Sequence, residues 1–308
     1  MGLKVGTRAA RLAKISGLVG LVGVAATGCS AEEVLRFGWP QSVTPQAERM
    51  RDLWTWSVVA ALVVGVIVWA LILWPVVFHR KKSEEMPRQT QYNLPLEFIY
   101  TALPLVIVVV LFYFTATTQT FVLDKEKEPN TTVDVVSFKW NWEFSYPGYK
   151  TPDGSPVRTV GTSQEIPLLV VPANEVVRYQ LSSKDVIHSF FVPQWHFKRD
   201  TLPRPEKNSQ DNVFQNTIDR EGSFVGRCAE LCGTYHSMMN FEVRALSPDK
   251  FKSYMDLRTR NNPQTGKPYT AAEALTAMNC GELCAPQAVT TKPFDTNRTV
   301  REASGTGR

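Results

Sequence analysis

A cluster of soft metal ligands lies in the stretch "GRCAELCGTYHSMMNF", which holds two cysteines, one histidine and two methionines. The whole chain of 308 residues has only five Cys and four His. Cys228 and Cys232 are four residues apart, and His236 follows four residues later. Thiolates and imidazole nitrogens bind transition metals, and this spacing lets one loop supply several of them. The stretch therefore predicts a metal site.

The identity of the metal follows from ligand softness. Structural zinc sites usually draw their ligands from paired cysteine knuckles, and the only upstream candidate here is His188 in "DVIHSFFVP". Two histidines, two thiolates and the thioether of Met239 favour copper instead. If both thiolates bridge two copper ions, one loop can hold a dinuclear centre suited to one-electron exchange. The alternative is a disulfide between Cys228 and Cys232.

Two long apolar runs predict how this site is anchored. Residues 54–78 and 94–122 are long enough to cross a bilayer core of roughly 30 Å. The connection, residues 79–93, carries four basic residues, so the positive-inside rule puts it in the cytoplasm. We therefore expect a transmembrane hairpin whose two ends lie outside. A buried-core reading of runs this long and uncharged is the weaker alternative.

The N-terminus resembles a secretory signal of the lipoprotein type. Residues 1–28 combine four basic residues with a short apolar run and the small residues before Cys29, which predicts lipidation of that cysteine. The alternative is that Cys29 ends an uncleaved anchor helix. Removal of the segment takes the net charge from +5 to +1, because it carries four basic and no acidic residues. This balance argues against nucleic-acid binding. Residues 29–53 would form an external N-terminal segment.

The exterior region divides into a sandwich and an extension. Residues 131–247 hold short β-branched and aromatic runs separated by turn residues, which predicts an antiparallel sandwich or barrel. Residues 248–308 form a polar, partly helical extension with a disordered terminus. Its "NCGELCAP" predicts a local disulfide, Cys280 to Cys284, with a turn at Gly281. A second copper site and free thiols are the alternatives.

At this point the chain resembles subunit II of haem-copper cytochrome c oxidase of the aa3 type, over residues 51–246. "CAELCGTYHSMM" matches the family's C-x-E-x-C-G-x-x-H-x-x-M signature. The resemblance implies a two-helix transmembrane hairpin plus an all-β, cupredoxin-like Greek-key sandwich. It also implies the two copper ions of a CuA centre, held by His188, Cys228, Glu230 (through its backbone carbonyl), Cys232, His236 and Met239. The Glu230 carboxylate would face a magnesium ion shared with subunit I, and Met238 would serve packing.

Further roles are implied by the same resemblance. Trp140 would be the point at which electrons enter. By the two-residue alternation of a strand, Trp142, Phe144 and Tyr146 would share a face with it and pack around it. The alternative is that any one of these rings is simply part of the sandwich core. Asp200 would lie near the magnesium waters. Glu97 would mark the cytoplasmic entrance of a proton path, although a carboxylate there can also be a mere interfacial residue. The pattern gives His196 and His79 no role.

The expected function is electron transfer within a respiratory enzyme, which makes the chain a component of an oxidoreductase and translocase. Electrons would pass from cytochrome c through CuA to haem a in subunit I, where reduction of O2 to water drives proton translocation. Partners would be subunits I and III in a bacterial plasma membrane. Residues 131–247 carry 13 acidic and 12 basic residues, so no acidic docking bias is visible. This suits a tethered donor, such as a cytochrome c domain of the bc1 complex, in the actinobacterial branch.

Two other classes remain open. A quinol oxidase subunit II shares the fold but lacks the copper ligands. A copper chaperone of the Sco type has two cysteines and a distant histidine, but on a thioredoxin-like fold with one anchor and a downstream histidine. The two predicted spans and the upstream position of His188 argue against it.

Overall fold

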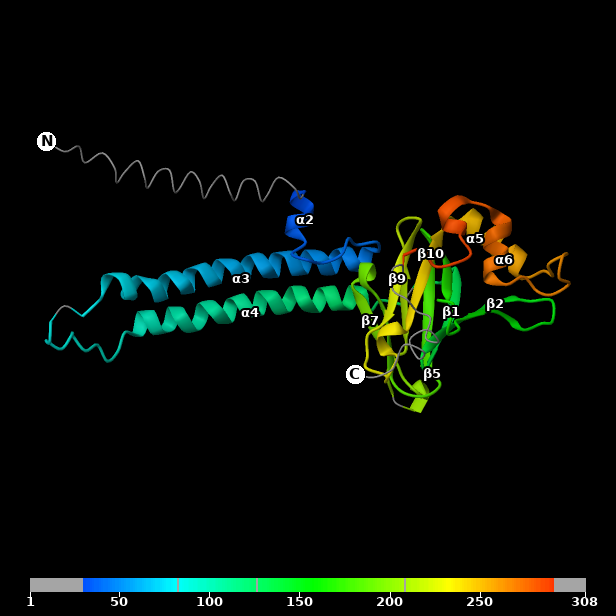
Figure 1. Ribbon diagram of the computed structural model, residues 1–308. Helices are drawn as coiled ribbons and strands as arrows, with labels where there is room; N and C mark the ends of the chain where they lie inside the picture. The colour runs from blue at the N-terminus through cyan, green and yellow to red at the C-terminus, as the bar shows by residue number, and fades with distance from the viewer. Residues whose placement is uncertain (1–29, 82, 126, 208, 291–308) are drawn as a thin grey trace, which may run out of the picture. The chain divides into compact units, whose positions relative to one another are not determined.

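The computed structural model describes residues 30–290, apart from residues 82, 126 and 208 (Figure 1). The predicted signal segment, Cys29 and residues 291–308 lie outside the described residues. Two compact units are present. One comprises residues 30–40 and 54–86, and the other comprises residues 41–53 and 87–290.

The first unit contains a short capped helix and most of a long apolar one. Helix α2, Ala31–Leu35, begins with a capping box in which Ser30 and Glu33 bond each other's backbone N–H groups. The Trp39 ring stacks on Trp54 at 5.3 Å, and Trp54 Nε1 donates to the Arg36 carbonyl. Helix α3, Pro45–Phe78, begins nine residues before the predicted span. The apolar run marks only the part of α3 that suits lipid, and the helix begins earlier because it also includes the polar turns before that run.

Helix α4, Leu94–Val122, covers the residues of the second apolar run. Asn93 caps its start by accepting a hydrogen bond from the Leu96 N–H, and Glu97 accepts one from the Asn93 N–H at 2.9 Å. The most apolar windows of α3 and α4 have mean hydropathies of 2.7 and 2.3, and both helices are long enough to cross a membrane.

The exterior region is a sandwich of two five-stranded sheets, as predicted. Their strand orders are β3-β2-β1-β5-β8 and β4-β10-β9-β6-β7. Two pairings, β1 with β5 and β4 with β10, are parallel, so the expectation of a purely antiparallel arrangement was wrong. Alternation of burial along a strand does not reveal its direction. The strands are β1 Thr131–Phe138, β2 Asn141–Lys150, β3 Pro156–Val160, β4 Leu168–Pro172, β5 Val176–Ser183, β6 His188–Val192, β7 Phe197–Thr201, β8 Val213–Thr217, β9 Gly222–Cys228 and β10 Asn240–Leu246.

The aromatic residues of β2 belong to the core, whereas Trp140, which precedes the strand, does not. Trp142, Phe144 and Tyr146 alternate along the strand and are fully buried. Trp140 precedes the strand, in the turn between β1 and β2, and is only partly buried. The expectation that these three rings share a strand face with Trp140 was therefore wrong. Period-2 alternation holds only within a strand, and β2 begins at Asn141.

The N-terminal segment of the second unit packs on the sandwich through backbone contacts. The Val43 N–H donates to the Gln194 carbonyl, and the Val43 carbonyl accepts from the Asp219 N–H. His196 Nδ1 lies 3.0 Å from the Ala47 carbonyl. His196 therefore joins the N-terminal segment to the sandwich.

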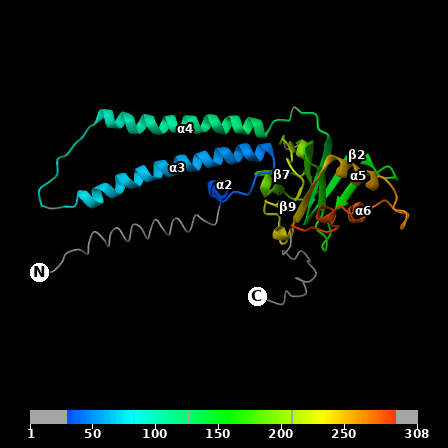
Figure 2. The same cartoon turned by 90° about the horizontal axis from the view of Figure 1, so that it is seen from above.

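The C-terminal extension packs on the sandwich at β4 and β10, on the side away from β7 (Figures 1 and 2). It contains α5 Pro248–Arg258, α6 Ala271–Met278 and a 3-10 turn, Gly281–Cys284. Cys280 and Cys284 form a disulfide, and the chain turns at Gly281, whose φ is +78°.

A buried ion pair on β10 holds the end of this extension. Arg244 Nε lies 2.6 Å from Glu242 Oε1, and both side chains are fully buried. The Arg244 guanidinium donates to the carbonyls of Leu283, Ala285 and Gln287. Glu242 Oε2 accepts from the N–H groups of Val289 and Thr290. We call this pair with its partners the clasp. Because its partners satisfy both charges, burial of the pair is tolerated.

Candidate metal centre

Three neighbouring strands of one sheet, β10, β9 and β6, position the predicted ligands. β9 ends at Cys228 and β10 begins at Asn240, so the intervening loop carries Cys232, His236 and Met239. The Cys228 N–H donates to the Met239 carbonyl, which closes the base of this loop. β6 pairs with β9 in a register that sets Phe190 opposite Cys228. His188, at the start of β6, is thereby brought to the same end of the sheet.

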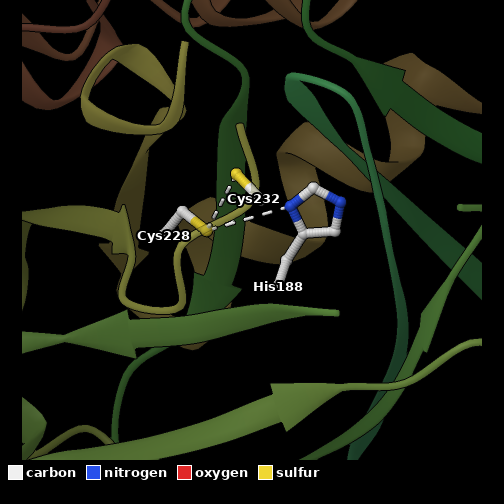
Figure 3. A group of neighbouring side chains, drawn as sticks. All are labelled: His188, Cys228 and Cys232. Carbon is white, nitrogen blue, oxygen red and sulfur yellow. Dashed lines mark hydrogen bonds between the residues drawn. The ribbon is translucent and has the colours of Figure 1, made fainter. Parts of the chain in front are cut away.

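The structure brings together donor atoms from all six predicted ligands. The ligand atoms of His188, Cys228 and Cys232 lie within 4.8 Å of one another (Figure 3). The two sulfurs are 3.8 Å apart. His188 Nδ1 lies 3.9 Å from Cys228 Sγ, and His236 Nδ1 lies 3.6 Å from Cys232 Sγ. Each thiol thus has one imidazole nitrogen beside it.

The two remaining donors complete the set. Met239 Sδ lies 3.9 Å from Cys232 Sγ, and the Glu230 carbonyl oxygen lies 3.3 Å from Cys228 Sγ. The cysteines are not joined in a disulfide. A set of two thiols, two imidazoles, one thioether and one carbonyl fits soft copper better than a hard oxygen-seeking cation.

Burial controls the protonation of this site. His188 is fully buried, and Cys228, Cys232 and Met239 are nearly so. Burial, together with the neighbouring Cys228, raises the pKa of Cys232 to about 12. Without a metal this thiol is therefore protonated near neutral pH. Metal binding at Cys232 must displace that proton.

Asp185 orients His188 from behind. Its Oδ1 atom lies 2.9 Å from His188 Nε2, while the opposite ring nitrogen faces Cys228. Burial lowers the pKa of His188, and the hydrogen bond to Asp185 opposes this effect. Burial would raise the pKa of Asp185, but its hydrogen bonds with His188 and with the N–H groups of Lys139 and Val186 lower it. Asp185 is therefore ionised and acts as an acceptor.

Two tryptophans contact the backbone of the metal loop. Trp140 Nε1 donates to the Cys232 carbonyl at 3.1 Å, and its ring meets Tyr235 edge-on at 5.0 Å. Trp142 Nε1 donates to the Met239 carbonyl at 3.2 Å. Gly233 has a φ of +118°, and a Cβ there would lie only 3.2 Å from Trp140 Nε1. Glycine is therefore required at this turn.

The other predicted residues lie apart from the sulfur cluster. Lys198 Nζ lies 3.6 Å from Asp200 Oδ1 and 3.5 Å from Glu230 Oε2, so an ammonium group stands between these carboxylates. Glu97 is at the start of α4 and helps to cap it. Met238 is buried in the 3-10 turn His236–Met238.

Reasoning from the sequence missed Asp185 and the contact made by Trp142. The signal for Asp185 was present, because "DVIH" places an acid three residues before a ligand histidine, where a turn can join them. The Trp142 contact depends on strand packing across 97 residues of sequence and leaves no local pattern.

The fold and site define a class of protein. This is a β-sandwich with two helices suited to a membrane and a thiol and imidazole site in the loop between β9 and β10. Two family models match the chain: the cytochrome c oxidase subunit II periplasmic domain over residues 131–246, and the subunit II transmembrane domain over residues 33–116. The chain belongs to the cytochrome c oxidase subunit II family, as the motif predicted, and is a membrane-anchored component of an oxidoreductase complex with a periplasmic domain.

Actinobacterial relatives match most of the chain. A probable cytochrome c oxidase subunit 2 of Nocardia farcinica is 49% identical, over 90% of this chain and 86% of the relative. The cytochrome c oxidase subunit 2 of Mycobacterium tuberculosis is 43% identical, over 89% of this chain and 86% of the relative. That of Corynebacterium diphtheriae is 38% identical, over 91% of each chain. Among solved structures, the periplasmic domain of subunit II of cytochrome oxidase from Bradyrhizobium japonicum is 26% identical, with a TM-score of 0.36, over 43% of this chain and 95% of that chain.

Proposed function

We propose that this chain holds a dinuclear CuA centre and passes electrons from a cytochrome c to haem in subunit I of the oxidase. The convergence of four further donor atoms on the paired Cys228 and Cys232 sulfurs carries the proposal. The ligands would be His188, Cys228, Glu230 (by its carbonyl), Cys232, His236 and Met239. When bound, the copper pair would supply one-electron exchange.

The protein's own groups prepare this site in three ways. Asp185 fixes the His188 ring so that Nδ1 faces the sulfurs. Burial of the thiols limits the access of water to them. Trp140 joins the surface to the ligand loop through its hydrogen bond to the Cys232 carbonyl, which favours it as the point where electrons enter.

Two further roles belong to the proposal. Glu97 would collect protons at the cytoplasmic start of α4, where its half-buried side chain lies in the first turn of the helix. Glu230 and Asp200 would face a magnesium ion at the boundary with subunit I, where Lys198 now contacts both acids. Subunits I and III, a bacterial plasma membrane, a lipidated Cys29 and a bc1-linked donor complete the proposed setting.

Metal content and spectroscopy of the full chain in detergent test the central proposal. We expect two copper ions per chain and an electron paramagnetic resonance signal shared over both ions. Cys228→Ser and Cys232→Ser should each abolish the signal. The matched control is the Cys280→Ser, Cys284→Ser double variant, which removes two sulfurs outside the site. One tightly bound zinc, with copper excluded, would refute the assignment.

A further inference from the structure

An exposed leucine, Leu231, lies on the surface of the metal loop. Among the described residues of the sandwich, Leu231 is the most exposed large apolar side chain, at 79%. It directly precedes Cys232, whose carbonyl accepts the Trp140 hydrogen bond. The Tyr235 ring meets Trp140 from the same loop. We call Lys139, Trp140, Leu231 and Tyr235 the donor face.

Two carboxylates that adjoin this face are already bound inside the protein. Asp185 accepts from His188 and from the backbone N–H groups of Lys139 and Val186. Glu143 is paired with Lys184 at 2.6 Å, and only 15% of its side chain is exposed. Asp185 and Glu143 therefore have little capacity left to bind lysines of a visiting protein. Glu230, which precedes Leu231, shares the Lys198 ammonium group with Asp200.

The uncommitted charge on the donor face is positive. The exposed Lys139 directly precedes Trp140, and among the described residues its ammonium group has no carboxylate partner. Residues 231–239 of the metal loop contain no acidic side chain at all. Charge complementarity at an interface sets which partners associate quickly and which are repelled.

We propose that the donor face selects a c-type cytochrome whose exposed haem edge is bordered by apolar and acidic side chains rather than by a ring of lysines. Leu231 and the Trp140 ring supply the apolar contact, and Lys139 supplies the selectivity for carboxylates. This inference rests on the proposed function, because it names the partner class of the same site.

Binding of two forms of one cytochrome to the full chain in detergent tests the inference. The probes are an oxidised, lysine-rich cytochrome c and the same protein after succinylation of its lysines, which reverses their charge. We expect the succinylated form to bind roughly 3- to 10-fold more tightly at low ionic strength, and added salt to reduce the difference. Lys139→Glu should cancel or reverse the preference. Leu231→Ser should weaken the binding of both cytochrome forms equally.

The matched control is Lys252→Glu, an exposed lysine on α5. α5 packs on Tyr149, which lies on β2 eight residues beyond its first residue, Asn141, or roughly 26 Å at the rise of a strand. This variant should keep the preference of the unmodified chain. Tighter binding of the lysine-rich form, equal binding of both forms, or no effect of Lys139→Glu would each overturn the inference.

Failure of this inference is distinguishable from failure of the proposed function. Oxidised probes exchange no electrons, so their affinities are measured whether or not the chain holds copper. A chain that binds two copper ions but shows no preference for the acidic probe refutes only the donor class. A chain that prefers the acidic probe but binds no copper refutes only the copper centre.

Discussion

His188 Nε2 lies 2.9 Å from Asp185 Oδ1, and the opposite ring nitrogen of His188 faces Cys228 Sγ. A carboxylate behind a ligand histidine fixes both the tautomer and the orientation of the ring. The same carboxylate accepts the Lys139 N–H, so one side chain supports a ligand and the turn that carries Trp140.

We expect Asp185→Asn to lower copper affinity about 10- to 100-fold, because the ring loses its ionised acceptor. Competition with a copper chelator measures the change. Asp256→Asn, an exposed acid on α5, is the control and should leave the affinity unaltered. An unchanged copper affinity in Asp185→Asn would show that the contact between Asp185 and His188 does not support metal binding.

Trp140→Phe should slow electron input while the copper spectrum stays intact, because the ring loses its hydrogen bond to the Cys232 carbonyl. Trp142→Phe differs, since Trp142 is fully buried and its Nε1 binds the Met239 carbonyl. That change should lower the free energy of unfolding by about 1–3 kcal/mol. Stopped-flow reduction and urea unfolding separate the two effects. Equal slowing of electron input in both variants would contradict the role of Trp140.

Copper loading should depend on pH through Cys232. Its pKa of about 12 means that the metal-free thiol is protonated at neutral pH, whereas the ligand is the thiolate. Each bound centre must therefore release at least this proton, and apparent affinity should rise at least about tenfold per pH unit between pH 6 and 9. An indicator dye in weak buffer measures the protons released. Loading without proton release would be incompatible with a thiolate ligand at Cys232.

Glu97→Gln should lower steady-state turnover of the assembled oxidase while copper content stays normal. Glutamine keeps an oxygen that can accept the Asn93 N–H, so the start of α4 should survive the change. Only the ionisable group is lost. Oxygen consumption measures turnover, and Glu85→Gln, in the polar connection that precedes α4, is the control. Normal turnover at every pH would leave Glu97 with its capping role alone.

The clasp should be a large contributor to stability. Arg244→Met leaves Glu242 buried without its partner, which costs about 3–5 kcal/mol of unfolding free energy. The Glu242→Gln, Arg244→Met double variant should cost less than Arg244→Met alone, because no unpaired charge remains. Urea unfolding measures both, with the exposed pair Glu221 and Lys250 as a comparison. Additive losses would show that the two side chains do not act together.

Much of the fold and site could be predicted because the information is local. The ligand motif lies within one loop, and the apolar runs mark their helices by composition. Features that depend on tertiary packing could not be predicted. Trp140 was assigned to a strand because the end of β1 and the start of β2 form one continuous aromatic pattern. Strand "NFEVRAL" alternates charged and apolar residues, which predicts a solvated face, yet every position in β10 is buried. Phe241 packs in the core of the sandwich, and Glu242 and Arg244 are covered by the extension.

The clasp also determines the order in which the exported chain can mature. A chain that leaves the cytoplasm from its N-terminus presents the metal ligands, which end at Met239, before Leu283 and Thr290 arrive to satisfy Arg244 and Glu242. Until then the last strand of the sandwich carries two charges that cannot be buried without cost. We therefore expect the ligand loop to reach its final form only after about fifty further residues have followed Met239. Metal binding that needs this final form would then come well after the synthesis of the ligands.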